Sequence, residues 1–125
     1  MAVGTEVYKE SDGKSVPVTL QYTTAAEAVA YVGGWLGITV TGGQSGDTVS
    51  LQIERQEYQF EVPSSLAVAV GEIVRINLAS LGSDHQPDDA AYNKNAESAT
   101  NINLFKATSA KDGNNVVTGI LLAGL

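Results

Sequence analysis

Three short segments in the middle of the chain alternate apolar and polar residues, and this pattern narrows the possible folds more than any other feature. The segments are residues 35–41, 49–53 and 58–62. A period of two places one set of side chains on one face of a pleated sheet and the other set on the opposite face. A glycine-rich turn (42–47) and a polar loop (54–57) separate the segments, and both suit hairpins. The pattern therefore predicts a three-stranded antiparallel meander in a small all-β fold.

Further segments with strand character lie on both sides of this meander. Residues 16–22 alternate, and Pro17, which has no N–H, is typical of the first or the edge strand of a sheet. Residues 23–32 fit either a short helix or a turn followed by a strand at 28–32, and the second is favoured because two glycines follow at once. The remaining strands are expected at residues 72–78, 104–108 and 116–122, with a hairpin turn at 111–115.

The 125 residues predict one domain, since 43% of them are hydrophobic and can form a core. Residues 1–15 are polar and carry both signs of charge, so we expect them to form an N-terminal arm. Residues 16–125 then form a single domain. Residues 80–103 contain few apolar side chains and predict one long polar, exposed loop. The apolar end of the chain is expected to pair in the sheet or to contact another subunit, and the candidate subunit contacts are Leu122 and Leu125.

The charge of the chain argues against two classes of partner. Seven basic and fourteen acidic side chains give a net charge of −7. Without a basic cluster, the chain is not expected to bind nucleic acid or anionic membranes. No apolar run approaches the ~20 residues of a membrane-spanning helix, and no signal-peptide pattern is present. The absence of cysteine excludes disulfides and thiolate zinc sites within the sequence.

No established catalytic pattern is present in the sequence. The single histidine, His85, lies near Asp84, Asp88 and Asp89, whose carboxylates suit a cation such as calcium. Their spacing matches no established metal-binding loop, and a solvated polar loop is the alternative interpretation. No second histidine can serve as the base for a nucleophilic serine. Trp35 lies in an apolar run, which favours core packing over a sugar-binding platform. We therefore expect a protein that is not an enzyme and that has no metal site or cofactor.

The ordered series of glycine turns and alternating strands resembles a family of tailed-phage proteins described as capsid decoration, or cement, proteins. One element of the series is the pattern V-x-x-G-[DE]-x-V, present here from Val68 to Val74. The similar segments are residues 34–41, 46–53, 58–63, 69–76 and 114–122.

The resemblance implies a small antiparallel β-barrel or β-tulip-like domain, commonly a homotrimer. Such a structural protein of the bacteriophage virion lies on the outer face of the capsid, binds the major capsid protein and bridges neighbouring capsid subunits. Residues 2–22 could then reach the capsid and add a strand to one of its sheets. Alternatively, residues 16–22 form the first barrel strand and only residues 1–15 are free. The predicted capsid contacts are Val3, Thr5, Val7, Tyr8, Val16, Val18 and Leu20.

Two further hypotheses belong to other classes of function. A carbohydrate-binding β-domain on the virion surface would recognise its ligand through Trp35, Tyr31 or Tyr92, because aromatic side chains combine an apolar face with a polar group. An enzyme would act through His85 and its acidic neighbours, and in that case a His85→Ala variant would lose the activity.

Overall fold

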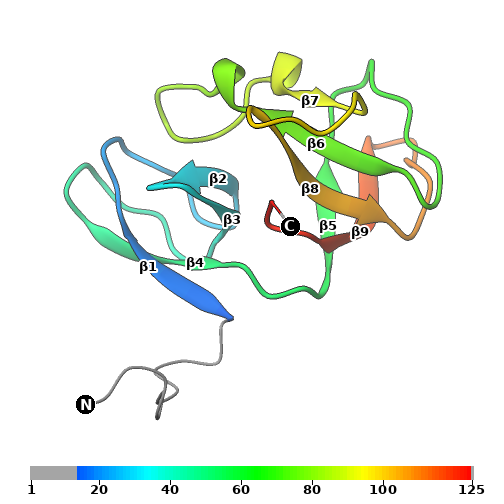
Figure 1. Cartoon of the computed structure of the whole chain (residues 1–125). Coiled ribbons are helices and arrows are strands. Elements are labelled where there is room, and N and C mark those ends of the chain that lie inside the picture. The colour runs from blue at the N-terminus through cyan, green and yellow to red at the C-terminus, as the bar shows by residue number, and fades with distance from the viewer. Residues whose placement is uncertain (1–13, 125) are drawn as a thin grey trace, which may run out of the picture.

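Figure 1 shows two antiparallel β-sheets in the computed structural model, which describes residues 14–124. The smaller sheet has the strand order β1-β4-β3-β2, and the larger sheet has the order β5-β9-β8-β6-β7. The smaller sheet consists of β1 (Ser15–Thr19), β2 (Val29–Val32), β3 (Trp35–Thr39) and β4 (Thr48–Gln52). The larger sheet consists of β5 (Glu57–Glu61), β6 (Ile73–Asn77), β7 (Tyr92–Asn93), β8 (Asn101–Ala107) and β9 (Val116–Leu121). The predicted all-β class is confirmed.

The predicted three-stranded meander is wrong at its third strand. β3 and β4 pair antiparallel as expected, but β5 pairs with β9 in the larger sheet. The second edge of β4 is occupied by β1, so no edge of β4 remains for β5. Residues 53–56 therefore cross from one sheet to the other instead of closing a hairpin (Figure 1).

β1 lies at an edge of the smaller sheet, as Pro17 predicted. The N–H of Leu20 donates to the carbonyl of Asp47, and the N–H of Ile53 donates to the carbonyl of Lys14. Backbone groups alternate in direction along a strand, so those of Pro17 point away from β4, where a missing N–H removes no bond of the sheet. The interpretation of residues 16–22 as the start of the domain is thus the one that matches the structure. Residues 1–13 of the predicted arm lie outside the described residues.

Two clusters of buried side chains form the core. The larger cluster comes mainly from the larger sheet, where the rings of Phe60 and Phe105 stack with their centroids 4.1 Å apart. Leu36 of β3 also belongs to it, so one face of the smaller sheet packs toward the larger sheet. The smaller cluster lies on the opposite face of the smaller sheet and consists of Val18, Leu20, Ala30, Val32, Val49 and Leu51. Both faces of the smaller sheet therefore contribute to burial, and each fully buried aliphatic side chain stabilises the fold by about 1.5–3 kcal/mol.

The predicted face of β3 is correct for Leu36 and Ile38 but wrong for Val40, which is 47% exposed. Thr39 is buried in place of Val40, at 1% exposure. Its hydroxyl accepts the N–H of Ala28 and donates to the carbonyl of Ala25. These bonds satisfy a polar group inside the fold, which removes the usual cost of burying it.

Residues 80–103 are only in part the exposed loop that their polar composition predicted: residues 94–100 are exposed, but other parts of the segment are built into the fold. They include a 3-10 turn at Asp89–Ala91, which follows another at Leu78–Ser80, and they contribute β7 and the start of β8. Ala91 is completely buried. The side-chain amides of Asn93 and Asn101 donate to each other at 2.8 and 2.9 Å. The polar side chains of this segment thus bond within the fold, and composition alone did not reveal that.

Candidate functional site

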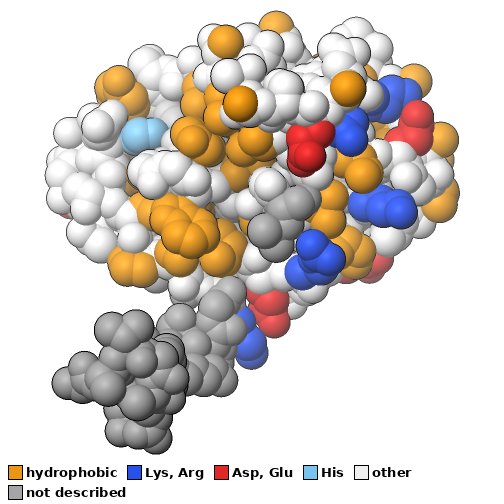
Figure 2. All heavy atoms as spheres, in the orientation of Figure 1, with side chains coloured by type: hydrophobic (Ala, Val, Ile, Leu, Met, Phe, Trp, Pro, Cys, Tyr) orange, Lys and Arg blue, Asp and Glu red, His pale blue; other side chains and the backbone are white. Residues whose placement is uncertain are grey.

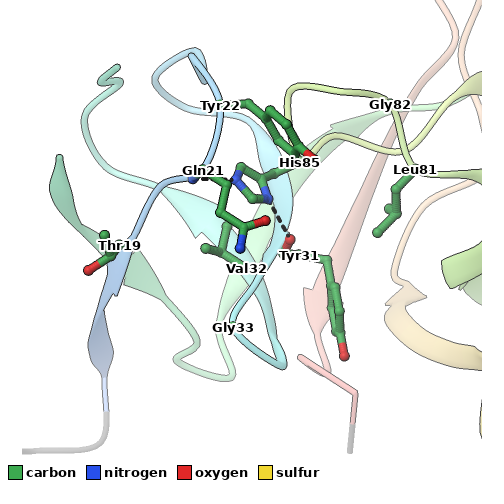
Figure 3. Close-up of a pocket in the computed structure, with 9 residues that line it drawn as sticks. All are labelled: Thr19, Gln21, Tyr22, Tyr31, Val32, Gly33, Leu81, Gly82 and His85. Atoms are coloured by element: carbon green, nitrogen blue, oxygen red, sulfur yellow. Dashed lines mark hydrogen bonds between the residues drawn. The ribbon is translucent and has the colours of Figure 1, made fainter. Parts of the chain in front are cut away.

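A pocket of about 400 Å³ lies between the ends of β1 and β2, the two edge strands of the smaller sheet (Figure 3). We call it the edge pocket. The segment after β1, the turn after β2 and the loop that follows Leu78–Ser80 supply its walls. Its volume falls within the range of about 300–1,000 Å³ that is usual for ligand sites. Its lining includes Thr19, Gln21, Tyr22, Tyr31, Leu81 and His85.

His85 joins the two walls of the edge pocket. The backbone N–H of Gln21, after β1, donates to Nε2 of His85 at 3.0 Å. Because Nε2 accepts this bond, the ring proton is on Nδ1, which donates to the carbonyl of Tyr31 in β2 at 3.2 Å. The N–H of Tyr31 in turn donates to the carbonyl of His85 at 3.0 Å. One loop residue therefore links the segment after β1 to β2.

The local conformation of His85 is held by its surroundings. Its φ angle of 66° lies in the left-handed region, which is uncommon for residues other than glycine. The hydroxyl of Thr24 donates to the carbonyl of the preceding residue, Asp84, at 3.0 Å. The ring of Tyr22 lies 5.0 Å from the imidazole, at a tilt of 48°. These contacts fix the loop against the smaller sheet, and the side chain of His85 is one of the few buried polar groups of the fold.

Both sequence-based interpretations of His85 need correction. The residue is 8% exposed, so it does not lie in a solvated loop. Both of its ring nitrogens are engaged by backbone groups, which leaves no free lone pair for a metal. Among residues 14–124, no group of three or more His, Asp or Glu side chains is placed to hold a metal ion.

The lining of the edge pocket contains aromatic and neutral polar groups but no carboxylate, lysine or arginine side chain. Two tyrosines offer ring surface, while the Thr19 hydroxyl and the Gln21 amide offer hydrogen bonds. This combination suits a neutral ligand with hydroxyl groups better than an ion. Sequence reasoning did not single out Gln21 or Tyr22, since only the bend after β1 brings them beside His85.

Trp35 lies on the surface, and its predicted position in the core is wrong. It is 46% exposed, and Tyr22 is 45% exposed. Trp35 is the first residue of β3, directly after a two-glycine turn, where no further strand covers it. Tyr92, the third aromatic residue proposed for sugar binding, lies in β7 and packs against the larger core. The structure therefore does not bring Tyr92 together with Tyr31 at the edge pocket.

The residues predicted to touch a capsid have very different positions. Val18 and Leu20 are 6% and 1% exposed and pack inside the smaller cluster, which argues against them as contact residues. Their side chains alternate onto the inner face of β1. Val16 is half-buried, as is Leu122, whose N–H donates to the carbonyl of Leu104. The other predicted contacts lie outside the described residues: Val3, Thr5, Val7, Tyr8 and Leu125.

Comparisons with known proteins found no relative of this chain. No family model, no curated protein and no solved structure matches it. No helix within residues 14–124 has the length and apolar character needed to cross a membrane.

Proposed function

We propose that the protein is a bacteriophage head decoration protein that binds the outer surface of the assembled capsid shell. Its partner is the major capsid protein, and it acts as a homotrimer without catalysing a reaction. One observation carries this proposal. The segments that resemble the decoration family correspond to β3, β4, β5, β6 and β9, which are framework strands of an all-β body.

The physical basis of such a function is binding to the assembled state alone. A protein that binds the closed shell but not its free subunits adds its binding free energy to the stability of the shell. A homotrimer that contacts several capsid subunits gains affinity from multiple weak contacts. A body whose strands are held in two hydrogen-bonded sheets loses little conformational entropy in those strands when it binds.

Apolar side chains on the surface can contribute to such contacts. Figure 2 shows hydrophobic side chains toward the middle and the lower left of one face, whereas most of the lysine and arginine side chains on this face lie over the larger sheet. The large apolar residues with the greatest exposure are Tyr22, Trp35, Val40 and Val70. Scattered exposed apolar residues are common, so these four are candidates for mutation rather than a defined interface.

Co-sedimentation with expanded empty heads tests the proposal. We expect the purified chain to sediment with expanded heads and to be present in purified virions. We also expect it to raise the temperature at which the heads break open. Deletion of residues 2–13 separates the arm from the body, since β1 begins only at Ser15. Loss of binding on deletion assigns the contact to the arm, and retained binding assigns it to the body. A full-length chain that is absent from virions and does not sediment with heads would overturn the proposal.

A carbohydrate-binding domain on the virion surface is the second candidate, and the edge pocket is the observation that favours it. Its lining is aromatic and neutral, and the lining residue Tyr22 is 45% exposed. Binding of the isolated protein to a glycan array, lost in a Tyr22→Ala variant that remains folded, would support it. Val40→Ala is the matched control, because Val40 is equally exposed but does not line the edge pocket. A silent array together with binding to heads would exclude this candidate.

A further inference from the structure

Among residues 14–124, no strand pairs with the second edge of β5. Leu121 donates to the carbonyl of Gln56, and Val62 donates to the carbonyl of Asn115, so the backbone groups of even-numbered residues in this strand point toward β9. The backbone groups of Glu57, Gln59 and Glu61 must then point away from β9. β5 is the outermost strand on this side of the larger sheet, so these donors and acceptors have no partner strand within residues 14–124.

Two hollows adjoin this free edge and lie between the two sheets. Their volumes are about 410 and 250 Å³, and Glu27, Ile38, Tyr58 and Gln59 line both of them. The shared residues show that the two hollows adjoin, and together we call them the groove, with β5 on one side and the ends of β2 and β3 on the other. A chain that pairs with β5 would therefore lie in this groove.

The two faces of β5 differ in chemistry. Tyr58 and Phe60 point inward and pack in the larger cluster, whereas Glu57, Gln59 and Glu61 are exposed on the outer face. Across the groove, Ile38 is apolar and Glu27 adds a carboxylate. No lysine or arginine lines either hollow. An added strand would thus meet apolar side chains on its inner face and carboxylates on its outer face.

We propose that this groove binds an extended segment of a partner protein that pairs with β5 and alternates basic with apolar residues. Main-chain hydrogen bonds to an exposed sheet edge supply affinity in this mode of recognition, and alternate side chains supply specificity. Apolar residues of the segment contact Tyr58 and Ile38, and its basic residues lie beside Glu57 and Glu61, as favourable cross-strand pairs require. This inference does not depend on the capsid function, because it concerns only the edge and its charge.

A synthetic peptide of alternating lysine and valine is the probe, and a peptide of alternating glutamate and valine is its matched control. Fluorescence anisotropy with the full-length chain measures the affinity. We expect the basic peptide to bind, and we expect the acidic peptide to bind at least about tenfold more weakly because of repulsion by the groove carboxylates. Binding of the basic peptide should weaken as salt is added, since exposed charge pairs are screened.

Variants separate pairing with β5 from nonspecific attraction to an acidic protein. Gln59→Pro removes an outward N–H but no bond to β9, and Pro17 shows that an outward-facing edge position in this fold accommodates proline. We expect this variant to lose about tenfold or more in affinity. Glu57→Gln combined with Glu61→Gln should lose about two- to thirtyfold. Asp88→Asn is the control for charge, because Asp88 lies outside β5, lines neither hollow and makes no side-chain cap bond; we expect no change.

Amide hydrogen exchange gives a second measurement that does not depend on the proline variant. Bound basic peptide should protect the outward amides of Glu57, Gln59 and Glu61, while the amide of Tyr58, which faces β9, changes little. Equal affinity for both peptides, protection elsewhere, or full affinity in Gln59→Pro would each overturn the proposal. No binding of the basic peptide would also overturn it and would indicate that the glutamates only protect the edge from aggregation.

Discussion

Replacement of His85 by alanine tests whether this side chain holds the two edge strands of the smaller sheet together. The imidazole accepts the N–H of Gln21 and donates to the carbonyl of Tyr31. Alanine keeps the backbone bond between Tyr31 and residue 85 but removes both side-chain bonds. It also leaves the N–H of Gln21 and the carbonyl of Tyr31 without these protein partners.

The expected loss of stability follows from these two bonds. A hydrogen bond contributes about 0.5–1.5 kcal/mol net, and a buried partner left unsatisfied costs about 1–3 kcal/mol. The edge pocket adjoins both groups, so water can replace part of each bond. We therefore expect unfolding to become easier by about 2–4 kcal/mol, from a total of about 5–15 kcal/mol. At roughly 4 °C per kcal/mol for a domain of this size, Tm falls by about 8–16 °C.

Urea and thermal unfolding, followed by circular dichroism, measure this loss. Ser83→Ala is the matched control, because Ser83 is an exposed residue of the same loop, and we expect a change within about 0.5 kcal/mol. Amide exchange localises the effect: protection of the Gln21 amide should fall in His85→Ala more than protection of the Leu20 amide, which is bonded to Asp47. A loss below about 0.5 kcal/mol with unchanged protection at Gln21 would refute the assigned role of His85.

Three further predictions concern other parts of the fold. Gly119→Ala places a methyl group 2.5 Å from the ring of Phe105 and should destabilise the protein by about 1–3 kcal/mol in urea unfolding, whereas Gly113→Ala, with open space around it, should be nearly neutral. Burial chiefly raises the pKa of Tyr92 to about 12 from 10.0, so the unfolded state ionises first, and stability should fall by about 2–3 kcal/mol as the pH rises through this window. Tyr92→Phe should abolish that pH-dependent loss. The fluorescence of Trp35, the single tryptophan, should be readily quenched by iodide, and a protected signal would contradict its exposed position.

Local patterns were sufficient to predict most strands and their faces. Alternation correctly placed Val74 and Ile76 of β6 in the core, because a strand's geometry fixes which residues share a face. Pro17 predicted an edge position, since a missing N–H is tolerated only where no neighbour needs it. The favoured interpretation of residues 28–32 as a strand is confirmed by β2.

The candidate site was much harder to predict than the strands. The sequence around His85 raised the possibility of a metal site formed with its acidic neighbours. The structural role of His85 depends instead on Gln21 and Tyr31, which lie 64 and 54 positions earlier in the chain. Hydrogen bonds over such separations leave no periodic signal in the sequence. The exposure of Trp35 could not be predicted either. Apolar residues flank a tryptophan at buried strand ends and at exposed strand ends alike, so its sequence neighbours do not distinguish the two positions.

The sequence by itself determined an all-β chain, its main strands and its principal turns, because these depend on alternation and on residues suited to tight turns. Only the tertiary structure decided which strands became neighbours. The alternating pattern of β5 is compatible with pairing to any strand that has an unpaired edge. Both edges of β4 are already paired, with β1 and with β3, so β5 pairs with β9 instead. Contacts between segments far apart in the chain also bury His85 and place the outer edge of β5 beside a groove.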